Sequence, residues 1–497
     1  MRAGWPGWAP AGAAFGLGAV LATGQAPLGF WWLALPALAA LIALICRAAG
    51  GRAAAWLGLF AGIGYFGLAM SWLISPFLVD PERHAWMAPF ALFFMAAGLS
   101  LFWAGAAALS FRAAPGWRPL ALAVTLAVAE LARGFVLTGL PWALIGHVWI
   151  GTWPGQVAAL LGPDGLTLMT TLAAALPVAL GLRGLVASAL LLAAAAAFGH
   201  SRLSAPDPAP ADVTLRLVQP NAAQEAKWDP DRALEHFRRL LDLTSAPPAT
   251  GPRPDLVIWP ETAVPFLLDL NPEIPGLVAE AGQGAQVAFG FQRVEGLRAW
   301  NSLAVIDPQG QIAAVYDKHH LVPFGEYIPF GDLAHDLFGL SAFAARQGQG
   351  YSAGPGPRLL DFGAPLGRAL PLICYEAVFP RDVAAAPDRP DWLLQVTNDA
   401  WFGTLTGPYQ HLAQARLRAV EQGLPLVRVA NTGVSALIDA RGRLLAQIPL
   451  GQMGALDVTL PGALPPTPFA RWGEAPVLLL LAGLAALALW PRRRSAA

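Results

Sequence analysis

The chemistry in this sequence is carried by a carboxylate, an ammonium and a thiol: Glu261, Lys318 and Cys374. Each stands at or just after a short apolar run that predicts a β-strand: 255–259, 311–317 and 368–373. A thiol has an ordinary pKa of about 8.5 and reacts as the thiolate, so it needs a base or a cation nearby. Together the residues predict acyl transfer. Glu261 would act as general base, Cys374 would attack an acyl carbonyl to give a thioester, and Lys318 would stabilise the oxyanion.

Taken singly, each residue also has an ordinary structural interpretation. Glu261 could cap a turn, Lys318 could be an exposed strand-end lysine, and Cys374 could be a small buried hydrophobe. However, Lys227 is the only other lysine, and arginine supplies the remaining positive charge. Lysine differs from arginine in being a compact point charge whose pKa shifts on burial. We therefore expect a chemical role for Lys318.

This chemistry requires neither a metal nor a cofactor, and we expect none. His319 and His320 are adjacent rather than spaced for chelation, and the polar half of the chain contains a single cysteine. The other cysteine, Cys46, ends an apolar run, so the two thiols are expected in different phases and cannot pair.

Composition places the chain among membrane proteins. Hydrophobic residues make up 56% and charged residues 13%, against about 25% charged in soluble proteins. The formal net charge is zero, so the basic footprint of a nucleic-acid-binding protein is absent. About 20 apolar residues cross a bilayer. We expect spans at 9–24, 28–46, 53–75, 85–110, 119–138, 159–182, 185–199 and 474–490.

Arginine placement indicates the orientation of these spans. Basic residues fall in alternate loops and after the last span: Arg2, Arg47, Arg52, Arg112, Arg118, Arg183 and Arg492 to Arg494. A cytoplasmic location for them requires seven spans before residue 200 and one after 473, with Arg83 and Arg133 as exceptions. The polar half is then extracytoplasmic. Glu130 and Arg133 lie three apart in the fifth span, where they could face an aqueous cavity or, as we expect, satisfy one another.

The polar half alternates short β-rich runs with helical patterns, which predicts a layered α/β domain with buried sheets. Helices are expected at 230–244 and 409–422. Strands are expected at 213–219, 255–259, 285–291, 302–307, 311–317, 368–373, 392–397, 425–430 and 434–439. The chain therefore divides into a membrane region (1–200), a linker (201–212), a catalytic domain (213–473) and a last span with a basic cytoplasmic tail (474–497).

Several motifs around these residues match a known family. The order Trp259-Pro260-Glu261, Lys318-His319-His320 and Cys374-Tyr375-Glu376 resembles the nitrilase or carbon–nitrogen hydrolase superfamily. The flanking spans and four further stretches, 321–327, 397–403, 410–412 and 431–433, make the whole chain similar to the apolipoprotein N-acyltransferase family. This resemblance implies a nitrilase-like α-β-β-α sandwich joined to a polytopic α-helical membrane domain of about eight spans.

The resemblance also implies supporting residues around the triad. They are Trp228 at the mouth of the site, Glu326 orienting Lys318 or the substrate, and Tyr375 and Glu376 beside the nucleophile. Asn301 is expected to line the pocket. Structural alternatives remain open: Trp228 could be a surface aromatic residue, and Glu326 could form a loop salt bridge.

The family resemblance further implies the substrates. A phospholipid gives its acyl chain to Cys374, and the acceptor is the N-terminal amine of the diacylglyceryl-cysteine of a lipoprotein. The apolar segment 321–345 independently suits an arm dipping into the bilayer interface, or else an ordinary core helix and loop. The expected location is the cytoplasmic (inner) membrane, with the catalytic domain on the periplasmic side. A membrane-tethered amidase or nitrilase is the alternative, and an inactive scaffold or transporter fits an intact triad poorly.

Overall fold

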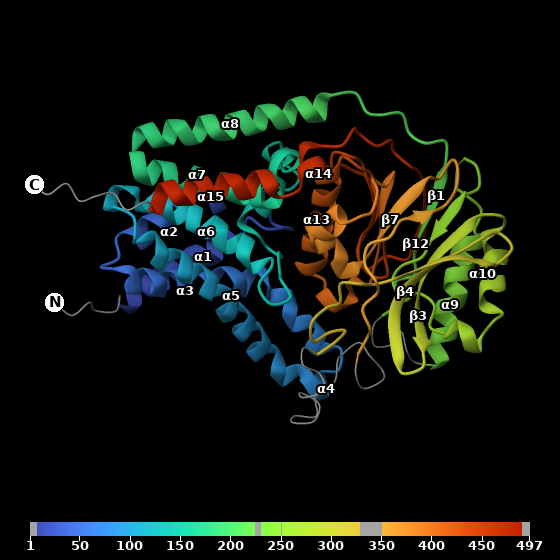
Figure 1. The fold of residues 1–497 in the computed structure, drawn as a ribbon. Coiled ribbons are helices and arrows are strands. Elements are labelled where there is room, and N and C mark those ends of the chain that lie inside the picture. Colours follow the sequence, from blue (N-terminus) through green and yellow to red (C-terminus); the bar gives the residue numbers. More distant parts are fainter. Residues whose placement is uncertain (1–6, 224–229, 250, 329–349, 490–497) are drawn as a thin grey trace, which may run out of the picture. The chain divides into compact units, whose positions relative to one another are not determined.

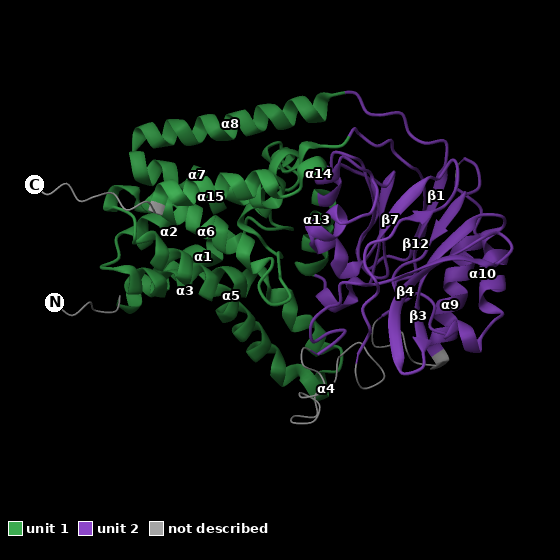
Figure 2. Ribbon diagram, viewed as in Figure 1, with its two compact units in different colours: residues 1–205, 405–417, 466–497 green, residues 206–404, 418–465 purple. Residues whose placement is uncertain are grey.

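The computed structural model describes residues 7–223, 230–249, 251–328 and 350–489. The chain divides into two compact units (Figure 2). Unit 1 comprises residues 1–205, 405–417 and 466–497, and unit 2 comprises residues 206–404 and 418–465. The boundary crosses helix α13 (Gly407–Gln422), whose first part belongs to unit 1. All strands in the described part of the chain belong to unit 2.

Unit 1 is built from apolar helices, seen in Figure 1. A helix pairs its backbone polar groups internally, which an apolar surrounding requires. Each of the eight apolar runs contains one long helix. These long helices are α1 (Trp8–Ala22), α2 (Trp31–Cys46), α3 (Gly51–Ala69), α5 (Ala88–Ser110), α6 (Arg118–Arg133), α7 (Ala158–Leu180), α8 (Leu182–Ser204) and α15 (Ala475–Leu489). Two short helices, α4 (Pro81–His84) and α14 (Pro468–Trp472), also belong to unit 1.

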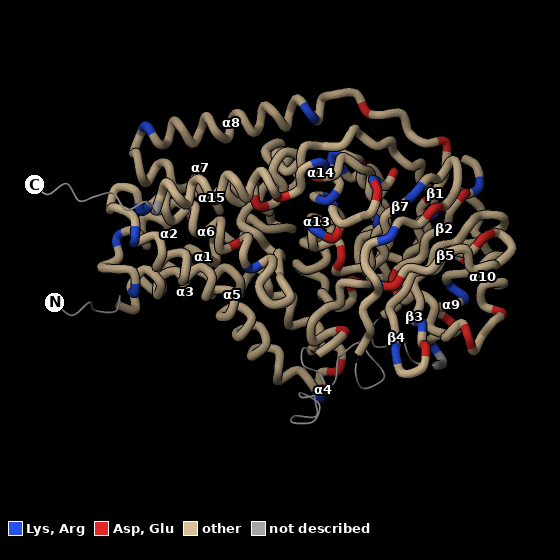
Figure 3. Tube along the Cα trace, viewed as in Figure 1, with Lys and Arg blue, Asp and Glu red and all other residues tan. Residues whose placement is uncertain are grey.

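Four helical stretches among the described residues are long and apolar enough to cross a membrane: Gly51–Ala69, Pro81–Ser110, Pro154–Leu180 and Leu182–Ser204. Shorter apolar helices are Trp8–Ala22, Trp31–Cys46 and Ala475–Ala488. Charged residues are sparse along the helices of unit 1 (Figure 3). This pattern agrees with the membrane character that composition predicts.

Helix α6 ends at Arg133, earlier than the predicted span at 119–138. The Arg133 guanidinium binds the chain that follows the helix, donating to the carbonyl oxygens of Leu140 (2.5 Å) and Trp142 (2.8 Å). It also pairs with Glu130 at 2.9 Å, and both side chains are fully buried. Trp103 donates a further hydrogen bond to Glu130 at 2.8 Å. The expected mutually satisfied pair is therefore confirmed.

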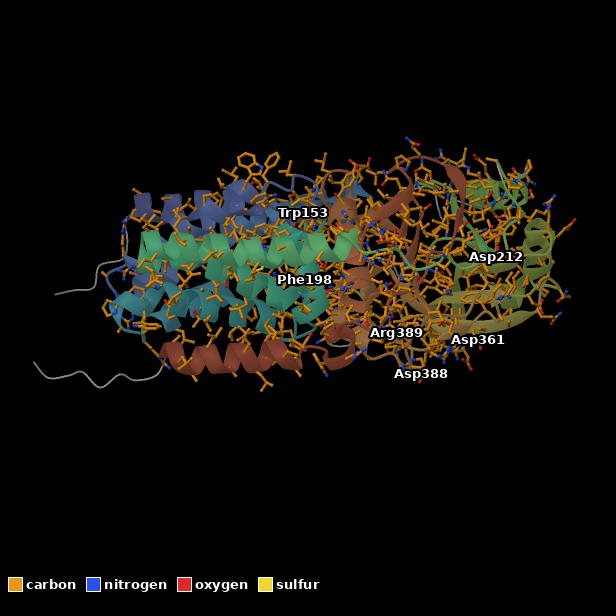
Figure 4. All side chains as sticks on the ribbon, turned by 90° about the horizontal axis from the view of Figure 1, so that it is seen from above. Trp153, Phe198, Asp212, Asp361, Asp388 and Arg389 are labelled. Atoms are coloured by element: carbon orange, nitrogen blue, oxygen red, sulfur yellow. The ribbon has the colours of Figure 1, made fainter. Side chains whose placement is uncertain are left out.

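Helix α8 packs closely on the segment that leads into α7. A Cβ atom at Gly199 would stand 1.8 Å from the carbonyl oxygen of Trp153, so only glycine fits there. The rings of Trp153 and His200 also lie 5.0 Å apart between centroids. Trp153 and Phe198, labelled in Figure 4, mark this crossing. A small residue thus lets the two backbones approach.

Unit 2 contains two six-stranded sheets. The first has the order β12-β1-β2-β3-β4-β5, in which β1, β2 and β3 run parallel and the other neighbours run antiparallel. Its strands are β1 (Thr214–Gln219), β2 (Leu256–Ile258), β3 (Gln286–Glu295), β4 (Arg298–Ile306), β5 (Ile312–Asp317) and β12 (Gly454–Thr459).

The second sheet has the order β11-β10-β9-β8-β7-β6, with β7, β8 and β9 parallel. Its strands are β6 (Leu360–Asp361), β7 (Arg368–Ile373), β8 (Trp392–Thr397), β9 (Leu426–Ala430), β10 (Ser435–Ile438) and β11 (Leu444–Ile448). The sheets meet where Ser435 Oγ of β10 donates to Gln219 Oε1 of β1 at 2.6 Å.

Helices α9 (Pro230–Ser245) and α10 (Ile274–Gly282) lie on one face of the first sheet (Figure 1). Phe237 and Leu240 of α9 and Val278 of α10 pack with Trp259 and Phe289 in one buried core. A short helix, α12 (Pro380–Ala384), precedes β8, and the turn between them carries Asp388 and Arg389, labelled in Figure 4. The predicted layered α/β architecture is thus confirmed in its two sheets.

All nine predicted strands are present, and 368–373 and 392–397 have the predicted ends. Three strands were not predicted: β6, β11 and β12. Strand β6 has two residues, β11 is largely exposed and β12 has a single buried residue, so none of the three shows a buried apolar run.

Candidate active site

Glu261, Lys318 and Cys374 all lie just beyond the carboxyl ends of strands. Glu261 follows β2, Lys318 directly follows β5, and Cys374 directly follows β7, so both sheets contribute. All three side chains are buried. The ammonium nitrogen of Lys318 lies 3.5 Å from Oε1 of Glu261. The structure therefore brings together residues that are 57 and 56 positions apart in the sequence.

Cys374 occupies a sharp turn between β7 and the 3₁₀ helix Cys374–Val378. Its φ angle is +51°, in the left-handed region that few non-glycine residues adopt. Gln395 Nε2 of β8 donates to the carbonyl oxygen of Cys374 at 3.2 Å and holds this turn. Backbone strain of this kind is concentrated at active sites, where the surrounding structure enforces it.

The surroundings of the Cys374 sulfur favour the neutral thiol. Burial raises the pKa of the Cys374 thiol well above its ordinary value, and the negative charge of Glu261 raises it further. The charge of Lys318 opposes this shift. A reaction through the thiolate would therefore need a base, and Glu261 is the carboxylate that acts on the sulfur most strongly.

Lys318 stays cationic although it is buried. Burial alone would lower its pKa, but Glu326 and Glu261 raise the pKa of Lys318 above the ordinary value. Its Nζ donates to Glu326 Oε1 at 2.9 Å. This hydrogen bond supports the expected role of Glu326 in orienting Lys318.

Asn301, on β4, bridges the two carboxylates. Its Nδ2 donates to Glu261 Oε1 at 2.6 Å and to Glu326 Oε1 at 3.1 Å. Its Oδ1 is buried and has no hydrogen-bond partner among the described residues. That oxygen can therefore accept a hydrogen bond from a group of the substrate.

Glu261 is held from two other sides. Its Oε2 accepts a hydrogen bond from the backbone N–H of Asn398, at the end of β8, at 2.8 Å. Gly290 of β3 lies against the backbone of this turn, because a Cβ there would stand 2.7 Å from the Glu261 Cα. A side chain at position 290 would displace Glu261.

Glu376 is completely buried and connects the turn of Cys374 to the chain around Lys318. It accepts hydrogen bonds from the backbone N–H of Ile373 (2.7 Å) and of His319 (2.8 Å). The Tyr316 hydroxyl donates to it at 3.0 Å. Since these groups come from β5 and β7, Glu376 couples the position of Lys318 to that of Cys374.

A histidine–carboxylate cluster supports this connection, and sequence reasoning missed it. Nδ1 of His319 lies 2.6 Å from Glu376, and Nδ1 of His320 lies 2.7 Å from Asp382. The His320 ring stacks on Phe379 at 3.7 Å between centroids, and Tyr375 packs edge-on against both rings. No motif marks Asp382, because its role arises from folding of α12 against the loop after β5.

Two predicted features, Trp228 and the arm at 321–345, lie wholly or partly outside the described residues. Trp228 lies outside the described residues. The predicted arm at 321–345 is described only as far as residue 328, where Val322 to Tyr327 form a tight turn. Phe324 is 59% exposed at its tip.

Two family profiles match the chain. The "Carbon-nitrogen hydrolase" profile matches residues 214–468, and the "Apolipoprotein N-acyltransferase N-terminal domain" profile matches residues 17–176. A Bradyrhizobium diazoefficiens protein named apolipoprotein N-acyltransferase is 41% identical, and the match covers 99% of this chain and 96% of that protein. The chain belongs to the apolipoprotein N-acyltransferase family.

Another member of this family, from Rhodopseudomonas palustris, is 40% identical over 98% of this chain and 96% of its own length. Among solved structures, an amidase from Nesterenkonia sp. is 18% identical with a TM-score of 0.38, and it covers 56% of this chain and 99% of its own. The family resemblance inferred from the motifs around Glu261, Lys318 and Cys374 is thus confirmed for apolipoprotein N-acyltransferases.

Proposed function

We propose that this chain moves a fatty acyl chain from a phospholipid, through a thioester on Cys374, to the N-terminal amine of the diacylglyceryl-cysteine of an apolipoprotein. The observation that carries the proposal is the convergence of Glu261, Lys318 and Cys374 in a buried site of a chain from this family. The expected catalytic residues are these three, and Asn301, Glu326, Tyr375 and Glu376 support them.

The first half-reaction forms the acyl-enzyme. Glu261 takes the thiol proton while the Cys374 sulfur attacks the ester carbonyl carbon of the phospholipid. The Lys318 ammonium stabilises the oxyanion of the tetrahedral intermediate. When the intermediate collapses, the carbon–oxygen bond of the ester breaks, and the lysophospholipid oxygen takes the proton from Glu261.

The second half-reaction transfers the acyl group. The acceptor nitrogen attacks the thioester carbonyl, Glu261 accepts a proton from that nitrogen, and the carbon–sulfur bond breaks to release an amide. The proton then returns to the sulfur. Because the site is buried, little water competes with the amine.

The proposed membrane arrangement has eight spans, with the catalytic domain at 213–473 on the periplasmic side of the cytoplasmic (inner) membrane. Within unit 1, the basic loop regions at 47–52 and 112–118 lie close together. Gly51 lies near Ala108 and Phe111, and the Arg118 guanidinium stands 4.2 Å from the centre of the Phe111 ring. Co-location of these loops supports their shared cytoplasmic placement. The exposed Phe324 supports a lipid-facing turn next to Lys318.

Intact mass analysis of purified protein incubated with phospholipid alone tests the proposal. We expect one added acyl chain, released by hydroxylamine and absent in Cys374→Ala. Wild-type protein that gains no acyl chain would overturn the thioester mechanism. A diacylated lipopeptide is added next. N-acylated peptide supports the proposed acceptor, whereas free fatty acid alone supports a membrane-tethered hydrolase.

A further inference from the structure

The end of β8 lies beside the nucleophile turn. Ile373 of β7 is in register with Val396 of β8, and the two strands are parallel. The next residues along each strand, Cys374 and Thr397, are therefore neighbours at the same edge of the sheet. Gln395 strengthens this junction through its hydrogen bond to the Cys374 carbonyl oxygen.

Thr397 is completely buried, and its hydroxyl serves two acceptors. Its Oγ1 donates to Oδ1 of Asp399 at 3.0 Å. As the neighbour of Cys374 at the sheet edge, the same side chain is also placed to bond the thiol, an interaction that lowers the pKa of Cys374. A hydroxyl has one proton to donate, so it can donate to the carboxylate or to the sulfur but not to both.

Asp399 is fixed from behind, so the hydroxyl is the part that can turn. Arg428 forms a fully buried ion pair with Asp399 and donates from Nη1 to Gln395 Oε1 at 2.5 Å. Rotation about one side-chain bond is enough to move the Thr397 proton from Asp399 to the sulfur.

The charged groups around Cys374 show why a negatively charged sulfur needs a hydrogen-bond donor in addition to Lys318. Glu261 and Asp399 disfavour a negative sulfur, and Lys318 is the cation that favours it. One hydrogen bond of the Lys318 ammonium is already made to Glu326. A further carboxylate, Glu376, lies in the 3₁₀ helix that begins at Cys374. The ammonium must also stabilise the oxyanion, so it cannot serve the sulfur alone.

We propose that Thr397 is a further catalytic residue, whose hydroxyl turns from Asp399 to the Cys374 sulfur whenever that sulfur carries negative charge. The inference rests on the proposed function. In acylation the hydroxyl stabilises sulfur as Glu261 removes its proton. In transfer it stabilises the sulfur that leaves with the electron pair of the carbon–sulfur bond. Thr397 keeps its own proton throughout, so the bonds formed and broken and the protons transferred in both half-reactions are unchanged.

The test measures thiol reactivity without lipid. Iodoacetamide alkylation of Cys374 is followed by mass spectrometry between pH 7 and 10 in a Cys46→Ser background, which leaves one thiol. Loss of a hydrogen bond to a charged sulfur should slow alkylation of Thr397→Val at least about tenfold at pH 8 and shift its pH profile upward. Thr397→Ser keeps the hydroxyl and should react like the parent. An unchanged profile in Thr397→Val would overturn the inference.

A matched control removes another buried threonine hydroxyl of unit 2. Thr244 accepts a hydrogen bond from Trp259 Nε1 at 2.8 Å, so Thr244→Val should lower the unfolding temperature and leave the alkylation profile unchanged. An equal shift in both valine variants would mean a merely structural role.

Acyl-enzyme formation from phospholipid is then measured in the same variants. Parent protein that alkylates normally but gains no acyl chain would contradict the proposed function and not the role of Thr397. Normal acylation of Thr397→Val would contradict only the role of Thr397.

Discussion

Glu326 lies closer to Lys318 than the proposed base does: its Oε1 stands 2.9 Å from Nζ, whereas Oε1 of Glu261 stands 3.5 Å away. The ammonium is therefore anchored mainly by a carboxylate that does not act on the sulfur. This division leaves Glu261 able to take a proton while Lys318 stays charged and in place.

Replacing Glu326 should separate the positioning of Lys318 from the proton transfer by Glu261. Glu326→Gln keeps the shape but removes the charge, so Lys318 should be drawn toward Glu261 and away from the oxyanion. We expect kcat for acyl-enzyme formation to fall about 10- to 100-fold, the range of one charge-assisted hydrogen bond. Glu295→Gln, in an exposed ion pair with Arg293, is the matched control and should keep its rate.

Lys318→Arg should be nearly inactive although the positive charge is kept. The planar guanidinium is larger than the ammonium and cannot occupy the same buried position between Glu261 and Glu326. We expect single-turnover acylation to fall by about 100-fold or more, measured by intact mass. Arg298→Lys, the reverse exchange at an exposed position, is the control. A near-normal rate in Lys318→Arg would assign Lys318 a structural role.

His319 should make stability depend on pH. Burial alone would lower its pKa, but hydrogen bonds to Asp382 and Glu376 raise the pKa of His319 to about 9. The folded protein thus binds the proton more tightly than the unfolded chain. This stabilisation is fully present below about pH 6.5 and is lost as pH rises through 9. We expect roughly 1–2 kcal/mol after allowing for solvent screening.

The measurement is the thermal unfolding midpoint of wild type and His319→Gln between pH 6 and 9.5. The difference between the two proteins should shrink as pH rises. A difference that stays constant over this range would show that His319 is not protonated in the folded state.

Arg133→Met should strongly destabilise unit 1. It leaves Glu130 charged and buried, and it removes the donors to Leu140 and Trp142. Breaking one partner of a buried ion pair costs about 3–5 kcal/mol, so the unfolding midpoint should fall by several degrees. Adding Glu130→Gln should recover part of this loss. Arg52→Met, at an exposed position in the first turn of α3, should change little.

Much of this protein could be predicted from its sequence. Apolar runs of about 20 residues leave few alternatives to helices, because unpaired backbone groups are costly in an apolar surrounding. The strands that lead to Glu261 and Cys374, β2 and β7, were predictable because buried parallel strands read as continuous apolar runs. The residues of the triad were identifiable because lysine is scarce and because the motifs around them match a family.

The tertiary structure alone decided how these residues act on one another. Asn301 bridges Glu261 and Glu326 because β4 pairs beside β5, a register that no local pattern encodes. Asp382 and Thr397 become part of the site only when segments distant in the chain fold together, since hydrogen bonds depend on position in space. The sequence determined which groups were available, and the packing of two sheets determined which of them share a proton.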